Sequence, residues 1–247
     1  MTRNRLSQSP IASLALVRQA LHALSNPTRA AGSSRFFKTG PGEYGEGDVF
    51  LGVSVPQIRS LVPSTDPLTE ADVLVLLRSR WHEERLLALL ILVRRFTRSK
   101  GDEKAQKHLV DLYLVNTRWI NNWDLVDSSA PYILGTWLLK RDRRVLKRLA
   151  ASSSLWEQRI AMLATQAFIR AGQFTETLQL GEYFLTHPHD LMHKASGWML
   201  RELGKRDLSA LRAFLDAHAS RMPRTMLRYA IEKFPPKERL RYLSKKS

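Results

Sequence analysis

One short stretch of the sequence places an aromatic ring and a carboxylate at a spacing that could do chemistry. Residues 121–127 read Asn-Asn-Trp-Asp-Leu-Val-Asp, so Trp123 and Asp127 are four residues apart. Side chains at this spacing share one face of a helix and would project together from its first turns. Pro131 cannot donate a backbone hydrogen bond to the carbonyl of Asp127, which predicts a bend beside the carboxylate. Alternatively, Trp123 belongs to the core and Asp127 is a solvated first-turn carboxylate favoured by the helix dipole.

A second group of residues surrounds a tryptophan with cations. Lys194, Trp198 and Arg201 follow spacings of four and three, which place them on one helix face. Such a face suits a DNA backbone, with the phosphates on the cations and apolar contact on the ring. A core tryptophan flanked by two snorkelling cations explains the same pattern. Arg159, near the start of another expected helix, is either a ligand for DNA or a surface charge.

Histidines supply the one pattern that could hold a metal ion. His189 and His193 are four residues apart, which is a ligand spacing on a helix. However, Pro188 interrupts the segment, no His-Glu-x-x-His motif is formed, and the chain has no cysteine. We therefore expect no metal site. The absence of cysteine also excludes disulfides and thiolate nucleophiles, and it is compatible with a reducing compartment.

The charge balance narrows the class of partner. The chain has 247 residues with 39 Lys and Arg against 23 Asp and Glu, a formal net charge of +16. This excess favours a polyanion, with nucleic acid before an anionic membrane surface, although charge that only maintains solubility is the alternative. Hydrophobic residues make up 44% of the chain, enough to build a core and to argue against disorder.

No segment of the sequence is typical of a membrane protein or a secreted one. The longest apolar run, Leu86 to Val93, falls short of the roughly 18 residues of a membrane span. Met1 to Pro10 is basic, but no signal-peptide core follows it. We expect a monomeric cytoplasmic protein, associated with the nucleoid and not with a membrane.

Helical periodicity dominates the elements that must position these residues. Trp81 to Arg95 shows it most clearly, Ser154 and Glu157 form a capping box, and no alternating pattern indicates a sheet. We therefore predict an all-α protein, with further helices over 11–24, 56–62, 69–79, 105–116, 122–140, 142–150, 155–171, 174–186, 191–204, 208–219, 223–234 and 236–243.

Residues 38–48 form a glycine-rich stretch that differs from the rest of the chain. It lacks the Gly-Lys-Ser/Thr ending of a phosphate-binding loop, and its three carboxylates, Glu43, Glu46 and Asp48, would repel phosphate. We expect an ordered surface loop packed by Tyr44 and Phe50.

A basic residue recurs early in four of the expected helices. Arg85, Arg159, Lys194 and Arg228 are separated by 74, 35 and 34 residues, and the first gap equals two units. A period near 35 with two helices per unit predicts a curved solenoid of antiparallel helix pairs. The recurring cations would then line its concave groove.

The expected organisation is a single domain over residues 1–247. It comprises an N-terminal helix and linker (1–34), the glycine-rich loop and a short helix (35–62), and helical repeats (63–244).

Four blocks together resemble the AlkD-like DNA glycosylases. The blocks are Phe50-Leu51-Gly52-Val53 followed by Pro56 and Arg59, Trp123-Asp124-Leu125-Val126-Asp127 followed by Pro131 and Gly135, Trp156-Glu157-Gln158-Arg159, and Lys194-Ala195-Ser196-Gly197-Trp198-Met199-Leu200-Arg201. They occur in the family's order and at compatible spacing, between about residues 35 and 234. The loop before Phe50 looks like that of a bacterial subgroup, so the range of substrates can differ.

The resemblance implies a stack of HEAT-like helix pairs that holds duplex DNA and excises N3- and N7-alkylated purines. It implies that Asp127 is the catalytic carboxylate and that Trp123 and Trp198 are the aromatic pair beside the lesioned nucleotide. Arg159 and Arg201 match residues near the backbone around the lesion. We expect Lys194, Arg85 and Arg228 to bind DNA as well, because they share the recurring basic position.

The residue types fit this chemistry without a metal or an organic cofactor. An N3- or N7-alkylated purine is cationic and departs as a neutral base, so no general acid is required. Positive charge moves to the deoxyribose as the glycosidic bond breaks, and a carboxylate near C1′ stabilises it and can orient a water molecule. Aromatic faces exclude bulk water and favour cationic character, while basic residues hold the phosphates.

Two other functions remain open at this level. A non-catalytic DNA-binding solenoid, which would recognise damaged or structured DNA, explains the net charge but gives Asp127 no role. A protein-binding scaffold is also compatible with helical repeats, but its partner would have to be acidic.

The net charge predicts that binding to duplex DNA depends strongly on salt concentration. If about 6 phosphates are neutralised on binding, log K should fall with log salt concentration at a slope of roughly −5. Lys194→Ala should weaken binding to damaged and undamaged duplex alike. A salt titration by fluorescence anisotropy measures both effects, and a slope near zero would contradict binding through basic residues.

Overall fold

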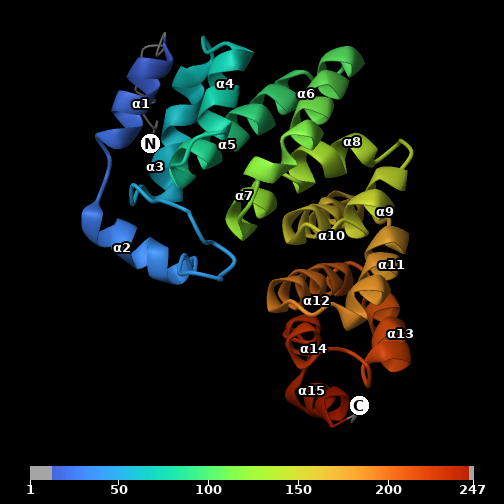
Figure 1. Cartoon of the computed structure of the whole chain (residues 1–247). Coiled ribbons are helices and arrows are strands. Elements are labelled where there is room, and N and C mark those ends of the chain that lie inside the picture. The colour runs from blue at the N-terminus through green and yellow to red at the C-terminus, as the bar shows by residue number, and fades with distance from the viewer. Residues whose placement is uncertain (1–12, 245–247) are drawn as a thin grey trace, which may run out of the picture. The chain divides into compact units, whose positions relative to one another are not determined.

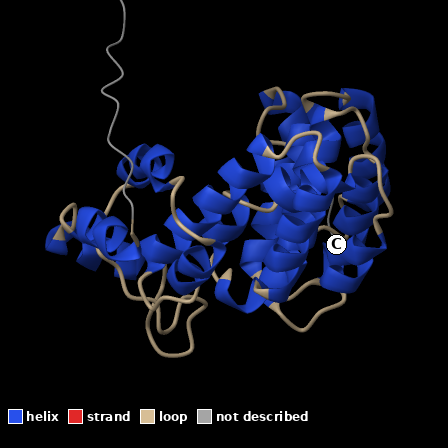
Figure 2. Ribbon diagram, turned by 90° about the horizontal axis from the view of Figure 1, so that it is seen from above, coloured by secondary structure: helices blue, strands red, loops and turns tan. Residues whose placement is uncertain are grey.

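The computed structural model describes residues 13–244, and this part of the chain consists of helices and loops without a strand (Figure 2). The all-α prediction is therefore confirmed. The first residues of the helix expected over 11–24, and the stretch from Met1 to Pro10, lie outside the described residues. None of the helices within residues 13–244 is both long enough and apolar enough to cross a membrane.

The chain divides into two compact units, at the step from Ser129 to Ala130. Unit 1 ends at Ser129 and unit 2 begins at Ala130, and each has its own buried apolar core. The single domain over residues 1–247 stays a prediction.

Unit 1 is organised around one long helix, α5 (His82–Arg98), which packs against α3, α4, α6 and α7 (Figure 1). Its buried face includes Leu86, Leu87, Leu89 and Leu92. The other helices of the unit are α1 (Leu14–His22), α2 (Pro27–Phe36), α3 (Val55–Leu61), α4 (Glu70–Leu77), α6 (Glu103–Val115) and α7 (Trp123–Asp127), with 3₁₀ turns at Val62–Thr65 and Thr117–Trp119.

Helix α2 occupies a region where the sequence predicts only a linker. Asn26 caps it by accepting a hydrogen bond from the Arg29 amide at 2.8 Å, and Pro27 occupies the first helical position. None of its residues is buried, so it has no apolar stripe and no periodic pattern to recognise in the sequence.

The glycine-rich loop is partly a surface loop, as expected, and Tyr44 donates a hydrogen bond to the carbonyl of Phe36 at 3.3 Å. The expectation that Asp48 presents its charge on the loop surface is wrong. Its side chain is buried and binds Arg85, so it belongs to the interior and does not present charge to a phosphate. The ion pair compensates for the cost of removing the carboxylate from water.

Unit 2 is a succession of helix pairs. Helices α10 (Leu155–Arg170), α12 (Asp190–Gly204) and α14 (Arg224–Ala230) pack side by side in that order. Helices α9 (Arg144–Ala150), α11 (Thr175–Tyr183) and α13 (Leu208–His218) each pack against the member of this row that follows them or precedes them. Paired packing of this kind is what the repeat predicts for residues 142–234, whereas a curved solenoid and a basic groove stay predictions.

The remaining elements of unit 2 are short. They are a π-turn at Pro131–Gly135, α8 (Thr136–Leu138), a 3₁₀ turn at Phe184–Thr186 and α15 (Pro236–Leu243).

The helix expected over 122–140 is not continuous. Helix α7 ends at Asp127, and the chain resumes helical geometry in the π-turn, where the amide of Gly135 donates to the carbonyl of Ala130 at 2.9 Å. Pro131 has no N–H for the Asp127 carbonyl, which explains why the regular helix stops there. The sequence predicts a bend beside Asp127, and the structure has an interruption of the regular α-helix there.

Two glycines of the sequence blocks permit close backbone contacts in unit 2. A Cβ atom on Gly135 would collide with the Ala164 carbonyl in α10. A Cβ atom on Gly197 would collide with the Met226 carbonyl and stand 2.6 Å from the Tyr229 Cβ atom in α14. These positions therefore set how closely neighbouring helices pack.

Gly197→Ala should destabilise the protein, because the added methyl group must push α12 and α14 apart. Overpacking of this kind costs about 1–3 kcal/mol. Gly32→Ala is the matched control, because Gly32 lies in α2 with no atom near its added Cβ, and alanine should there leave stability unchanged or raise it slightly. Thermal unfolding followed by circular dichroism compares the two, and equal melting temperatures would contradict the close contact.

Candidate functional site

Trp123 opens α7 and belongs to an aromatic cluster in unit 1. The Asn122 side chain accepts a hydrogen bond from the Trp123 amide at 2.8 Å and so fixes the start of the helix. The indole stacks on Phe37, with ring centroids 5.1 Å apart and planes at 18°, and meets Phe36 edge-on at 5.8 Å. Trp123 is half-buried, so it is held by these rings yet keeps part of its surface exposed.

The stack continues inward to a buried histidine. Phe37 also stacks on Phe50, with centroids 5.0 Å apart, and Phe50 stacks on the His82 ring at 4.6 Å. Phe36 and Phe37 are not among the site residues that the sequence predicts. The available signal was a pair of adjacent aromatic residues just ahead of the glycine-rich loop, which periodicity does not detect.

His82 lies between two carboxylates and is almost completely buried. Its Nδ1 atom is 3.1 Å from Oδ2 of Asp48, and its Nε2 atom is 2.8 Å from Oδ2 of Asp124. Burial opposes the charged form, but the Asp124 and Asp48 carboxylates outweigh it and raise the pKa of His82 to about 9. At neutral pH the ring is therefore an imidazolium that donates to both carboxylates.

Asp48 joins three parts of unit 1 at one carboxylate. It accepts hydrogen bonds from His82 and Arg85 in α5, and from the Asn122 side chain at 2.8 Å. Burial favours the neutral acid, but the hydrogen bond from His82 and the charge of Arg85 hold the pKa of Asp48 below its ordinary value. We call Asp48, His82, Arg85, Asn122 and Asp124 the buried charge network.

Arg85, one of the expected DNA contacts, lies in the interior of unit 1. Its side chain is buried, and besides Asp48 it donates to the carbonyls of Ser79 at 3.0 Å and Arg80 at 3.2 Å. A guanidinium held in this way stabilises the interior and is not available to a phosphate.

Asp127 ends α7 and is half-buried. The interpretation as a first-turn carboxylate favoured by the helix dipole is wrong, because α7 has only five residues and Asp127 is the last of them. A carboxylate near the free carbonyls at a helix end is disfavoured. Its charge adds to the effect of burial in raising the pKa of Tyr113. The helix dipole of α7 therefore does not favour an acidic residue here.

In unit 2, helix α12 carries three of the expected DNA contacts. Lys194 is partly exposed and pairs with Asp190 at 2.8 Å. The half-buried Trp198 donates from Nε1 to Glu202 at 3.1 Å. Arg201 pairs with Glu232, which lies just after the end of α14. The two cations are thus partly neutralised. The Lys194 pair is exposed, and a pair of this kind is worth about 0–1 kcal/mol and can be exchanged for a phosphate. The Arg201 side chain is only 17% exposed.

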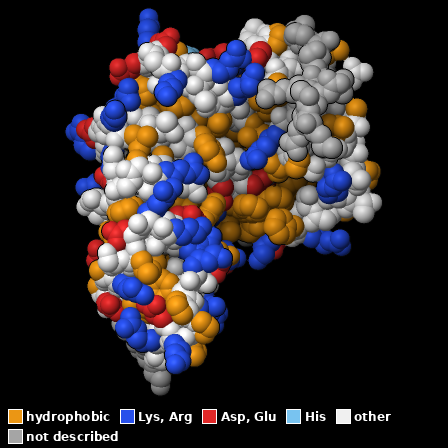
Figure 3. All heavy atoms as spheres, turned by 180° about the vertical axis from the view of Figure 1, so that it is seen from behind, with side chains coloured by type: hydrophobic (Ala, Val, Ile, Leu, Met, Phe, Trp, Pro, Cys, Tyr) orange, Lys and Arg blue, Asp and Glu red, His pale blue; other side chains and the backbone are white. Residues whose placement is uncertain are grey.

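The other two expected cations of unit 2 differ in exposure. Arg159 in α10 is buried and donates to the Leu191 carbonyl at 2.7 Å, so it connects α10 to α12. Arg228 in α14 is exposed. Lysine and arginine side chains are spread widely over the face seen in Figure 3, with acidic side chains among them.

His189 and His193, the pair considered for a metal ion, have partners within the protein, as does the neighbouring His187. The His193 ring forms a hydrogen bond with the His187 carbonyl at 2.5 Å. The His187 ring accepts a hydrogen bond from the His189 amide at 3.0 Å, and the His189 ring accepts one from the Leu191 amide at 3.1 Å. Burial helps to lower the pKa of His187, which favours the neutral ring that these contacts require. Residues 13–244 contain no group of three potential metal-binding side chains.

Comparison with protein families identifies the family of this chain. The sequence model of the family described as DNA alkylation repair enzyme matches residues 17–234. The chain belongs to the DNA alkylation repair enzyme family. The match covers both units, and a role in the repair of alkylated DNA, with DNA as the partner, follows from membership of the family.

A solved structure agrees with this assignment at the level of the fold. A predicted DNA alkylation repair enzyme from Enterococcus faecalis superposes with a TM-score of 0.66 at 16% sequence identity, over 86% of this chain and 97% of the other. Comparison with curated proteins gives no sequence match.

The buried charge network of this DNA alkylation repair family member should make its stability depend on pH. The pKa of His82 is raised from 6.5 to about 9 in the folded protein. The stabilisation is therefore complete below pH 6.5 and is lost as the pH rises to 9. It amounts to at most about 3 kcal/mol, at 1.36 kcal/mol per pKa unit.

Urea unfolding between pH 6 and 9.5 measures this dependence. The parent should lose stability over that range and His82→Gln should lose much less. His108→Gln is the matched control, because His108 is exposed and pairs only at the surface with Glu70. Parallel pH profiles for the parent and His82→Gln would show that the ring is not charged in the folded state.

Proposed function

We propose that the protein is a DNA glycosylase that hydrolyses the N-glycosidic bond of cationic N3- and N7-alkylated purines in duplex DNA. The observation that carries the proposal is the setting of α7, where a half-buried indole and a half-buried carboxylate stand at the two ends of a five-residue helix. Membership of a DNA alkylation repair family supports the substrate class.

Rigid positioning of α7 supports a catalytic role for it. Its first residue follows Asn122, which binds Asp48, and its second residue, Asp124, binds His82. The Trp123 ring is held independently by Phe36 and Phe37. A short helix fixed by buried charges on one side and by rings on another can hold a carboxylate in a preorganised position, which is what electrostatic catalysis requires.

Asp127 would then act on the sugar and not on the base. Cleavage of the bond between C1′ and the purine nitrogen sends the electron pair to the cationic base, which leaves neutral. The deoxyribose becomes an oxocarbenium ion, and the Asp127 carboxylate stabilises it and orients the water molecule that adds to C1′. Trp123 contributes an aromatic face that excludes bulk water and favours cationic character.

Unit 2 would bind the DNA backbone mainly through α12. Lys194 and Arg201 would exchange their carboxylate partners for phosphates, and Trp198 would supply apolar contact to the lesioned nucleotide. Arg228, which is exposed, is a further phosphate contact in this proposal. Arg159 would act close to the backbone only if its guanidinium can serve the DNA as well as the Leu191 carbonyl.

The second candidate is a non-catalytic protein that recognises damaged or structured DNA. The cations of α12 favour DNA binding equally in both cases. The two functions differ in what they require of Asp127, since a binding protein gains nothing from a carboxylate that repels phosphate.

Asp127→Asn should therefore remove catalysis and spare binding. The substitution keeps the shape of the side chain but removes the charge, at a loss of roughly 3 kcal/mol or ~100-fold in rate, the scale of one preorganised group. Affinity for duplex should hold or improve. Single-turnover excision from a duplex with one N7-methylguanine measures the effect.

The control is Asp111→Asn, which removes an exposed carboxylate of α6 that pairs with Lys107. This variant should excise at the parent's rate. Equal rates for the parent and Asp127→Asn would refute the mechanism, and a parent that binds the duplex but excises nothing would establish the non-catalytic candidate. Uracil, whose departure as a leaving group needs assistance that this site lacks, should be a poor substrate.

A further inference from the structure

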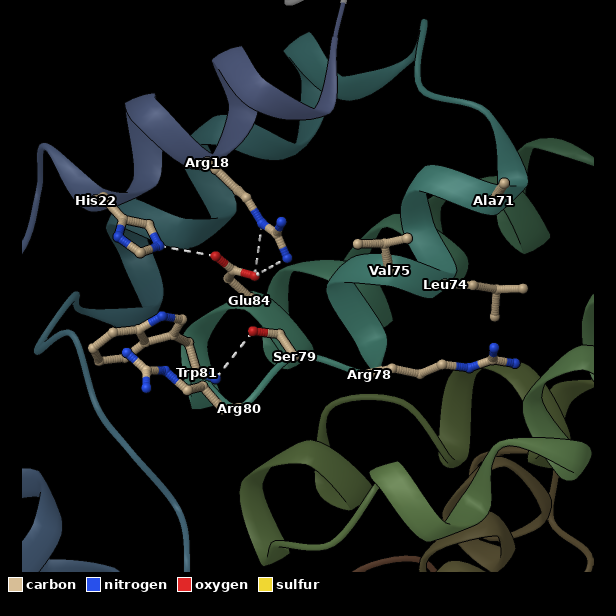
Figure 4. Close-up of a pocket in the computed structure, with 10 residues that line it drawn as sticks. All are labelled: Arg18, His22, Ala71, Leu74, Val75, Arg78, Ser79, Arg80, Trp81 and Glu84. Atoms are coloured by element: carbon tan, nitrogen blue, oxygen red, sulfur yellow. Dashed lines mark hydrogen bonds and ion pairs between the residues drawn. The ribbon is translucent and has the colours of Figure 1, made fainter.

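Unit 1 contains a hollow, between α1, α4 and the start of α5, that the proposed reaction does not use. Its volume is about 880 Å³, within the range of small-molecule sites. Its lining is mixed, with charged residues facing an aliphatic wall (Figure 4), and comprises Arg18, His22, Ala71, Leu74, Val75, Arg78, Ser79, Arg80, Trp81 and Glu84.

The charges in this hollow are not balanced. Glu84 is the one carboxylate in the lining, and it is buried and already accepts hydrogen bonds from Arg18 at 2.9 Å and His22 at 2.8 Å. Arg78 donates to a neutral group, the Asn116 side-chain oxygen, at 3.1 Å. Arg80 has no carboxylate partner among residues 13–244 and lies 4.8 Å from the centre of the Trp81 ring. Two guanidinium charges therefore share the hollow without an acidic partner.

The rest of the lining suits a flat, largely apolar body. Ala71, Leu74 and Val75 form the aliphatic wall on α4, and Val75 is 45% exposed although it is β-branched and apolar. Trp81 offers an indole, with the His22 ring edge-on at 5.6 Å. Figure 4 shows Arg80 beside the indole, and Arg78 on the side of the wall that carries Leu74.

We propose that this hollow binds a nucleoside phosphate. The phosphate would pair with Arg80 beside the indole, with Arg78 as a second unbalanced positive charge of the lining, and the base would lie against Trp81 and the aliphatic wall of α4. Arginine suits this role because its planar group pairs with phosphate and stacks on rings at the same time. The same chemistry is offered by a free mononucleotide and by the phosphorylated end of a DNA strand.

Calorimetric titration of the full-length protein tests the site. The ligands are deoxyadenosine 5′-monophosphate, deoxyadenosine and inorganic phosphate, at one salt concentration. The nucleotide should bind at least ~10-fold more tightly than either fragment, because it alone uses both the cations and the aromatic wall. Equal affinity for the nucleotide and inorganic phosphate would overturn the proposal in favour of general anion binding.

Substitutions in the lining test whether the nucleotide binds in this hollow. The double variant Arg78→Gln, Arg80→Gln removes two charges at exposed positions, and Trp81→Leu removes the ring. Each should weaken nucleotide binding ~10-fold or more, since hydrogen bonds to charged groups and base stacking are each on this scale. Arg144→Gln is the matched control, because Arg144 is 89% exposed and lies in unit 2. Parent-like affinity in the double variant, whose fold circular dichroism would verify, overturns the proposal.

A 5′-phosphorylated single-stranded oligonucleotide separates the two sources. If the site holds a strand end, the phosphorylated oligonucleotide should bind more tightly than the same sequence without the phosphate, and the double variant should abolish the difference. If the site holds free nucleotide, the terminal phosphate should have no effect and the mononucleotide should retain its preference. Neither result depends on excision, so failure here is distinguishable from failure of the proposed glycosylase.

Discussion

The charged hydrogen bonds of His82 are the interaction on which the arrangement of unit 1 depends. The imidazolium connects Asp48, at the end of the glycine-rich loop, to Asp124, in the first turn of α7. Neither element has an extensive apolar face of its own, because α7 has five residues and the loop is largely exposed. A buried ion pair is weak evidence for net stability, but removing one partner leaves an uncompensated charge. The network therefore specifies one position for α7.

The first turn of α5 fixes the positions of other elements of unit 1 as well. His82, Glu83, Glu84 and Arg85 are consecutive and all buried, which is rare for charged residues. Glu83 accepts hydrogen bonds from the amides of residues 51–53, which holds the segment containing Gly52, and Glu84 binds α1 through Arg18. One helical turn thus fixes α1, the glycine-rich loop and α7, so the hollow beside α1 and the Trp123 stack depend on the same helix start.

The sequence predicts those features that depend on local pattern. Capping at Ser154, the long apolar periodicity of α5 and the interruption at Pro131 follow from rules that act within a few residues. Features that depend on partners far along the chain could not be predicted. Asp48 and Asn122 are 74 residues apart, and nothing near either of them shows that they meet inside the protein. The contacts of Phe36 and Phe37 with Trp123 could not be predicted for the same reason, because Trp123 lies far along the chain.

The recurring basic position shows why a periodic pattern of charge is ambiguous. Arg85 is buried against Asp48, Arg159 is buried against a backbone carbonyl of α12, and only Lys194 and Arg228 keep exposed charge. A guanidinium early in one helix can satisfy a carbonyl or carboxylate of a neighbouring element, so the recurrence serves packing in part of the chain. Where the position is Lys194, the flexible ammonium pairs with Asp190 on its own helix and stays partly exposed. The cation at this position is therefore buried in its first two occurrences, where it serves packing, and exposed in the last two, where the proposed function needs it.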